Sequence, residues 1–154
     1  MAGEVVIATG YATPEFKLLS SRFRMMDTFV IATRRLPARL RREIARARAM
    51  SWDTERPYHY LRWTHDHRLL VGGEDLRHKT GRNRRTRLKN CRERLRAFAA
   101  RVYPVLAGEV PEYAWEGLFA ETPDGLPFVG RHHDARERRS RSVEGVRRLS
   151  SRRR

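Results

Sequence analysis

The sequence predicts an α+β fold in which helices pack on an antiparallel sheet. Two apolar runs flank the turn-forming residues THDH (64–67), which is typical of a β-hairpin. Apolar residues recur every three or four positions over 81–103, as in an amphipathic helix. The run YAWEGLF (113–119) indicates a further strand.

The hairpin is the clearest local signal, and its predicted strands are YHYLRW and RLLVGGED. Successive side chains point to opposite faces of a strand, so Tyr58 and Tyr60 share one face. Gly72 and Gly73 fall late in the second strand. Glycines there predict a bulge, or a place where another group approaches the backbone closely.

Shorter signals complete the predicted elements. The continuous apolar run Val5–Ala8 predicts a strand covered on both faces, and a second strand is predicted over 22–32. A short amphipathic helix is predicted within 36–50, because a proline stands in its first turn. After a predicted turn over 121–127, the residues FVG (128–130) begin another strand.

Cys91 is the only cysteine, so the chain forms no internal disulfide and suits a reducing compartment. We therefore expect a cytoplasmic protein. Cys91 falls on the apolar stripe of the long predicted helix, which predicts a buried core thiol rather than a nucleophile. That stripe also contains Leu88, Leu95, Phe98 and Val102. No stretch reaches the roughly 18 apolar residues that a membrane span requires.

The net charge of +16 raises the question of an anionic partner. Residues 131–154 hold ten arginines against three acidic residues, and they include no aromatic side chain. Such a segment buries too little apolar surface to offset the entropy of ordering, so we predict a disordered tail. The tail predicts weak, non-specific binding of nucleic acid.

No metal site and no catalytic residue are predicted from spacing. His65 and His67 flank an aspartate in the predicted turn, whereas a structural zinc site needs four ligands and commonly uses cysteine. The carboxylates show no spacing that fixes an acid–base pair. They include Asp53, Glu55, Glu74, Asp75, Glu116 and Asp124.

Three motifs in order carry a resemblance to a known family. They are EVVIATG (4–10), RLLVGGED (68–75) and YAWEGLFAETPDGLPFVG (113–130). Together they resemble FAD-dependent oxidoreductases of the D-amino-acid oxidase, glycine oxidase and sarcosine oxidase type. The last motif resembles the family signature W-x-G…D-G-x-P-x-x-G through Trp115, Gly117, Asp124, Gly125, Pro127 and Gly130.

The resemblance implies a division of the chain. Residues 1–12 would be a remnant strand of the FAD-binding domain, and 13–121 the substrate-binding domain, an antiparallel sheet with helices. Residues 122–130 would begin the return to the FAD-binding domain, and 131–154 would be the disordered Arg-rich tail. The abrupt change after residue 130 resembles an out-of-frame reading of GC-rich DNA. A non-functional truncated product is a further hypothesis.

The resemblance also implies a reaction and site residues. Family members transfer a hydride from a C–H next to nitrogen of a small amine or amino acid to the flavin. Thr9 and Gly10 would line FAD, and Tyr60, Trp115 and Phe119 would be walls of the substrate pocket.

Two departures from the family limit this expectation. The chain lacks the G-x-G-x-x-G motif whose glycines hold the FAD pyrophosphate, so we expect an interior fragment, inactive alone, that does not retain FAD. Phe119 stands where amino-acid oxidases have an arginine that clamps the substrate carboxylate. The substrate would then be an amine without that carboxylate, or one held by another arginine such as Arg62.

The alternative hypothesis is a basic nucleic-acid-binding protein with an arginine-rich tail, since the predicted long helix has an arginine-rich outer face. That face lacks the interleaved aromatic residues of a base-stacking surface. A salt series would separate the two hypotheses, because phosphate binding weakens steeply as salt rises.

Overall fold

The computed structural model describes residues 8–11, 20–44, 49–81, 83–132 and 142–143. The chain divides into two compact units. One unit comprises residues 27–118, and the other takes in the described residues on either side of it.

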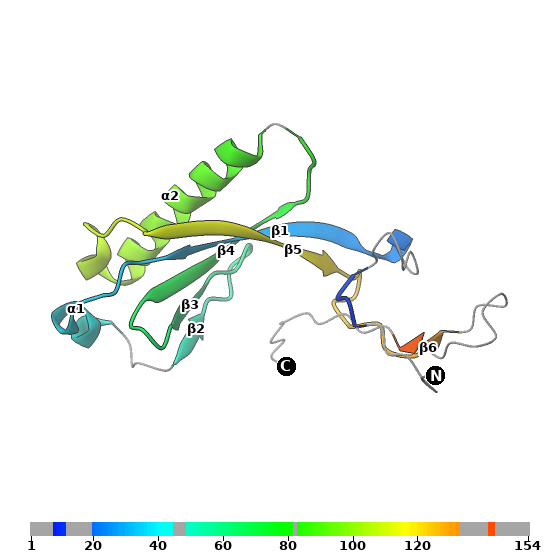
Figure 1. Ribbon diagram of the computed structural model, residues 1–154, viewed down its shortest axis with the longest axis horizontal. Helices are drawn as coiled ribbons and strands as arrows, with labels where there is room; N and C mark the ends of the chain where they lie inside the picture. The colour runs from blue at the N-terminus through cyan, green and yellow to red at the C-terminus, as the bar shows by residue number, and fades with distance from the viewer. Residues whose placement is uncertain (1–7, 12–19, 45–48, 82, 133–141, 144–154) are drawn as a thin grey trace, which may run out of the picture. The chain divides into compact units, whose positions relative to one another are not determined.

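The described part is built from seven strands, two α-helices and two 3₁₀ turns (Figure 1). In chain order they are η1 (Ser20–Arg22), β1 (Arg24–Ala32), α1 (Ala38–Glu43), β2 (Met50–Trp52), β3 (Tyr60–Trp63), β4 (Leu69–Arg77), α2 (Arg84–Val102), η2 (Pro104–Leu106), β5 (Tyr113–Glu121), β6 (Arg131–His132) and β7 (Ser142–Val143).

Five strands form one sheet in the order β2-β3-β4-β1-β5. The β2–β3 and β3–β4 pairs are antiparallel, and the second of these is the predicted hairpin. Its register pairs Tyr60 with Gly72 and Leu61 with Val71. The α+β fold with an antiparallel sheet and helices is therefore confirmed.

Helix α2 packs along one face of this sheet and closes the core (Figure 1). Cys91 and Leu95 on α2 are fully buried against Phe29 of β1 and Val71 of β4. Fully burying a side chain of this size stabilises a fold by about 1.5–3 kcal/mol. The predicted helical stripe is confirmed at these positions, but it is wrong at Val102, which is 41% exposed where the helix ends.

The predicted bulge lies at Gly73 and Glu74 of β4, where both residues have positive φ angles of 141° and 56°. A Cβ at Gly73 would lie 2.5 Å from the carbonyl oxygen of Tyr58, so only glycine fits there. The bulge interrupts the ladder just beyond the Tyr60–Gly72 pair. Strand β3 therefore begins at Tyr60, two residues later than predicted.

The end of α1, the start of α2 and the predicted strand at 128–130 also differ from the predictions. The apolar pattern does not show where the backbone conformation changes. Helix α1 ends at Glu43, and Ile44 is already extended. Helix α2 begins at Arg84 rather than Gly81, whose φ of 143° is not helical. Residues 128–130 are not a strand, and β6 begins only after them.

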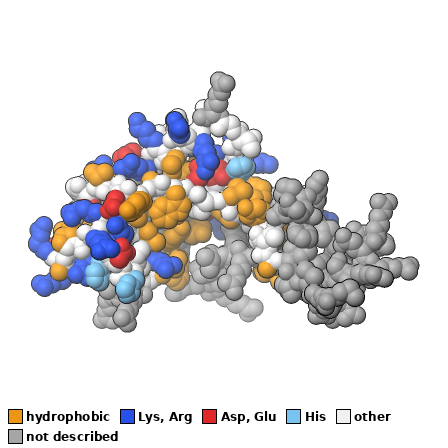
Figure 2. Space-filling model, in the orientation of Figure 1, with side chains coloured by type: hydrophobic (Ala, Val, Ile, Leu, Met, Phe, Trp, Pro, Cys, Tyr) orange, Lys and Arg blue, Asp and Glu red, His pale blue; other side chains and the backbone are white. Residues whose placement is uncertain are grey.

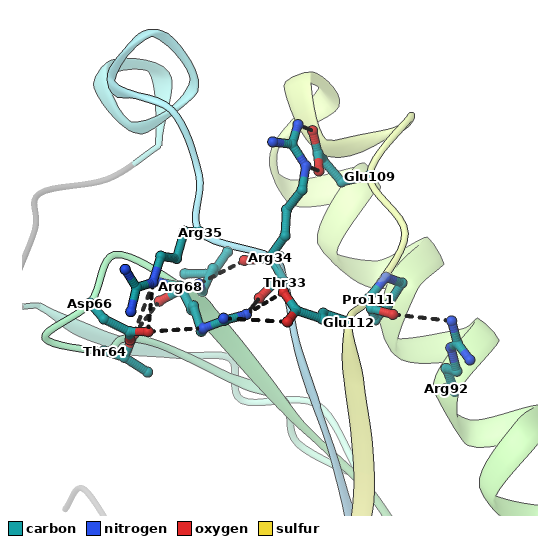
Figure 3. A network of polar contacts seen from close by, with 11 residues as sticks. Thr33, Arg34, Arg35, Thr64, Asp66, Arg68, Arg92, Glu109, Pro111 and Glu112 are labelled. Atoms are coloured by element: carbon teal, nitrogen blue, oxygen red, sulfur yellow. Dashed lines mark hydrogen bonds and ion pairs between the residues drawn. The ribbon is translucent and has the colours of Figure 1, made fainter.

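Near the turn between β3 and β4, charged side chains connect three segments (Figure 3). These are the hairpin turn, the segment after β1 and the segment before β5. Arg68 Nε donates to Asp66 Oδ2 at 2.9 Å, and its Nη1 donates to Glu112 Oε2 at 2.6 Å. Beside them, Arg34 makes a bidentate pair with Glu109 at 2.7 and 2.9 Å. These contacts fix the start of β5 against the ends of β1 and the hairpin.

The second unit contains the antiparallel pair of β6 and β7. Its other described contacts include an edge-to-face pair of Phe23 and Phe128, with ring centroids 5.8 Å apart. Four residues of the segment predicted to be disordered thus form short paired strands, and the rest of that segment lies outside the described residues. The predicted strand Val5–Ala8 is described only at Ala8, which is not in a strand.

Candidate functional site

Tyr60 lies on β3 with its ring over Gly72 of β4. A Cβ at Gly72 would lie 2.1 Å from the Tyr60 Cζ atom, so the absence of a side chain at Gly72 makes room for the ring. The tyrosine therefore lies against the sheet, across the neighbouring strand. Because side chains alternate, Tyr60 is on the face opposite Leu61, which belongs to the core under α2.

The Tyr60 hydroxyl shares a side-chain hydrogen bond with Thr28 of β1. Burial raises the pKa of the Tyr60 phenol, and the charges of Tyr58 and Asp75 raise it further, whereas the bond to Thr28 opposes the shift. The phenol is consequently a neutral donor and acceptor at neutral pH. It can orient a ligand through hydrogen bonding, without offering a charge.

Trp115 lies on β5 on the same face of the sheet as Tyr60. Thr28 of β1 shows this, because it hydrogen-bonds Tyr60 and also faces Gly117 of β5. Its methyl carbon is 3.5 Å from the position that a Cβ at Gly117 would take. Trp115 precedes Gly117 by two residues and so shares its face. The structure thus brings two of the predicted pocket walls, Tyr60 and Trp115, to one sheet face with β4 and β1 between them. Trp115 is 42% exposed.

Further side chains of this face come from β2 and β3. Met50 and Trp52 are paired with Arg62 and Tyr60 respectively, and directly paired residues point to the same side. Met50 and Trp52 are each 48% exposed, so large apolar groups accompany Tyr60. In Figure 2 hydrophobic side chains form a contiguous group in the middle of the view, among the charged ones. Arg62 supplies the face with a cation.

The remaining predicted site residues belong to the second unit. Phe119 is half-buried on β5. Thr9 is exposed, and its hydroxyl donates to the Tyr11 carbonyl oxygen at 2.7 Å. Gly10 has a φ of 81°, and no atom lies within 4 Å of where its Cβ would be. Phe119, Thr9 and Gly10 are therefore described apart from Tyr60 and Trp115, which belong to the other unit.

A part-buried polar network lies on the α2 side of the sheet, and no pattern in the sequence predicts it. The backbone N–H of His59 donates to Asp53 Oδ1 at 2.8 Å, and His59 Nδ1 lies 3.0 Å from Asp53 Oδ2. Its Nε2 lies 3.2 Å from Glu74 Oε1, and Arg94 Nε donates to Glu74 Oε2 at 2.7 Å. The His59 ring stacks on Phe98 with centroids 4.1 Å apart.

The network contains His59, which precedes Tyr60, and Glu74, which follows Gly73 in the β4 bulge. It therefore fixes the backbone on both sides of the Tyr60–Gly72 contact. Asp53 and Glu74 belong to the carboxylates of the sequence that show no diagnostic spacing. They are 21 residues apart and meet only through the bulge, so no local spacing could have indicated their shared histidine.

The described residues do not fit the pyrophosphate of FAD. Such a group needs backbone N–H donors from a glycine-rich turn that leads into a helix. The ten glycines of the chain include no G-x-G-x-x-G spacing. Thr9 offers one hydroxyl, which is already bonded, and Gly10 is a single glycine with a positive φ angle.

The part of the chain that the structure describes contains neither a metal cluster nor a membrane-crossing helix. Within 8–11, 20–44, 49–81, 83–132 and 142–143, no three His, Cys, Asp or Glu side chains are arranged to hold a metal ion. In the same ranges no helix combines the length and apolarity needed to cross a bilayer.

Residues 1–147 match the family model described as DAO, FAD dependent oxidoreductase. The chain therefore belongs to the DAO family of FAD-dependent oxidoreductases, as the resemblance implied. No curated protein sequence matches it.

Solved structures show the same fold. The chain is similar to glycine oxidase from Geobacillus kaustophilus, with a TM-score of 0.61 and 22% identity over 94% of this chain. It is also similar to L-proline dehydrogenase from P. horikoshii, with a TM-score of 0.60 and 16% identity over 94% of this chain. The chain spans 36% and 37% of the lengths of those two proteins.

Proposed function

We propose that this chain supplies the substrate-binding part of an FAD-dependent amine oxidoreductase. Residues 13–121 are its substrate-binding domain, 1–12 and 122–130 belong to the FAD-binding domain, and 131–154 is an Arg-rich tail. Family membership supports the proposal. The division into units supports it too, because the unit 27–118 falls within the proposed substrate-binding domain.

The observation that carries the proposal is the shared sheet face of Tyr60 and Trp115, opposite α2. Aromatic walls bury the hydrocarbon part of a ligand and exclude water, while a few polar groups fix its orientation. The Tyr60 phenol, held by Thr28, is the polar group. Phe119 is proposed as a further substrate contact on the family resemblance alone.

The proposed substrate is an amine without an α-carboxylate. Phe119 offers no donor where an arginine would make paired bonds to the two carboxylate oxygens. Arg62 is the other possible partner of a carboxylate, since it is exposed and shares the Tyr60 face. Carboxylate substrates held by Arg62 are therefore the outcome that would correct this assignment.

The test uses the full chain co-expressed with the nucleotide-binding part of Geobacillus kaustophilus glycine oxidase. We expect a flavin-containing complex whose flavin absorbance is bleached, without oxygen, by simple primary amines but not by α-amino acids. Phe119→Arg should increase the rate with α-amino acids by about 10- to 100-fold, because a charge-assisted pair is gained. Leu118→Arg places the same charge one residue away and should leave that rate unchanged.

Three results would contradict the proposal. Bleaching by α-amino acids in the unaltered complex, lost in Arg62→Ala, would assign the carboxylate to Arg62. A flavin-containing complex whose flavin is bleached by no amine would contradict the proposed reaction. Tyr60→Phe and Trp115→Ala complexes that react with amines as the unaltered complex does would contradict the proposed pocket.

The chain alone is proposed to be inactive, because it lacks the pyrophosphate-binding turn. The alternative function, nucleic-acid binding, draws support from the net charge of +16. It requires an oligonucleotide affinity that persists at physiological salt, whereas non-specific binding through the tail should be lost there.

A further inference from the structure

A cavity of about 550 Å³ lies where β4 ends and α2 begins. It is lined by the end of β4, the connecting loop and the first turn of α2. The lining residues are Leu76, Arg77, Lys79, Thr80, Gly81, Asn83, Arg84 and Arg87. Small-molecule sites in proteins have volumes of about 300–1,000 Å³, so a molecule of nucleotide size fits.

Among the described residues, the lining carries four cations and no carboxylate. Two of the four are neutralised from outside the cavity, because Arg84 pairs with Glu116 and Arg87 pairs with Asp27. Neither Arg77 nor Lys79 has an ion pair within the described residues, and both are exposed. The cavity therefore holds two positive charges that no acidic group of the described chain balances.

Neutral donors face the same space. Thr80 and Asn83 supply a hydroxyl and an amide, and Asn83 makes no side-chain cap to the first turn of α2. That first turn contains no acidic residue, so the positive end of the 19-residue helix is not compensated by a side chain of its own. The cations, the donors and the helix end all favour one kind of ligand, which is an oxyanion.

We propose that this cavity binds the phosphate group of a small phosphorylated molecule. Arg77 and Lys79 bind the phosphate oxygens, Lys as a compact charge and Arg through paired donors. The site shares no residue with the Tyr60 face, and it does not depend on the proposed amine oxidation. The same chemistry could be offered by a nucleic-acid backbone, and the experiment separates the two sources.

The experiment titrates the full chain with inorganic pyrophosphate by calorimetry at pH 7.5, with ionic strength held constant by chloride. We expect saturable binding at one site. Lys79→Ala should weaken it about tenfold, because one charge-assisted bond is lost, and Lys79→Glu should abolish it. Lys89→Ala and Lys89→Glu are the matched controls, since Lys89 is exposed on α2 outside the cavity. They should change the affinity less than twofold.

Circular dichroism of each variant establishes that α2 is intact, and Arg77→Gln provides a second, uncharged replacement in the cavity. The site is overturned if pyrophosphate shows no saturable binding to the folded chain. It is overturned equally if the Lys79 and Lys89 variants lose affinity in parallel. Binding of a single-stranded oligonucleotide that pyrophosphate cannot displace would show a polyanion surface instead of a phosphate site.

Discussion

At the scale of single residues, the pair of Tyr60 and Gly72 decides how the tyrosine ring lies on the sheet. The tyrosine ring occupies the volume that any side chain at Gly72 would need. The conformation of Gly72 is not the reason for glycine, since its φ is not positive; the close approach of a ring is. A larger residue at position 72 must therefore displace Tyr60.

Gly72→Ala should reduce the free energy of unfolding by about 1–3 kcal/mol, as overpacking typically does. The same substitution in a Tyr60→Ala background should cost far less, because the ring that it strikes is gone. Urea unfolding of the four proteins in this cycle measures the coupling. Gly108→Ala is the control, since no atom lies within 4 Å of its Cβ position. Additive losses in the cycle would disprove the contact.

Asp66 gives a pH-dependent contribution to stability. Hydrogen bonds from Thr64 and Arg68 lower the pKa of Asp66 from 3.8 to about 2. A lowered folded pKa means that the contribution is present above the unfolded value and is lost as pH falls through the folded one. The window therefore runs from about pH 4 down to about pH 2.

Asp66→Asn should flatten the stability curve in that window. Denaturant unfolding at steps between pH 5 and pH 2 should show the unaltered chain losing stability more steeply than the variant. Glu55→Gln, in an exposed turn, should follow the unaltered chain. A Glu55→Gln curve as flat as that of Asp66→Asn would contradict the assignment.

At the scale of elements, the β4 bulge and helix α2 depend on each other through His59. Glu74 connects the bulge to the helix, because it accepts a hydrogen bond from Arg94 of α2 and lies beside the His59 ring. Its positive φ would be costly for most residues and is maintained by these two partners. The bulge and the helix thus fix the start of β3, which carries Tyr60.

Glu74→Ala should destabilise the chain by about 1–3 kcal/mol, because buried His59 and the exposed Arg94 both lose the carboxylate that they contact. Both residues have a Cβ, so the backbone strain at position 74 does not change between them. Glu93→Ala is the matched control. It removes an exposed pair with Arg96 at 3.5 Å, which is worth under about 0.5 kcal/mol. Equal losses of stability in thermal melts of the two variants would argue against a connection between the bulge and α2 through Glu74.

At the scale of the whole molecule, the chain has a five-stranded sheet with α2 on one face, and its sequence has no G-x-G-x-x-G motif. Its neighbours among solved structures are about three times its length. The sheet face that carries Tyr60 and Trp115 has large apolar side chains that are between 42% and 48% exposed. A face of this kind is typical of a surface that another structure covers.

The purified chain should be colourless, and added FAD should not raise its melting temperature. A ligand bound at 100 times its Kd would add about 2.7 kcal/mol to stability, which a thermal melt detects readily. The absorbance spectrum and the melt with and without FAD are the measurements. Flavin absorbance that co-elutes with monomeric chain would show that these residues hold FAD after all.

The sequence alone determined the elements whose signals are local. The hairpin, the long helix and β5 follow from apolar periodicity and turn residues within short windows, and the bulge from two adjacent glycines. The family followed from three motifs in order. Alternation also placed Tyr58 and Tyr60 on one face, although only Tyr60 is in the strand.

Tertiary structure alone decided which distant residues meet. Arg34 and Glu109 are 75 residues apart, and His59 finds Asp53 and Glu74 only because the bulge turns Glu74 toward α2. Element ends depended on the same closure, since β3 begins only where its ladder with β4 starts, next to the bulge. The physical reason is that a periodic pattern reports which face a residue occupies. Its partner on that face is fixed only when strand order, register and helix docking bring the segments together.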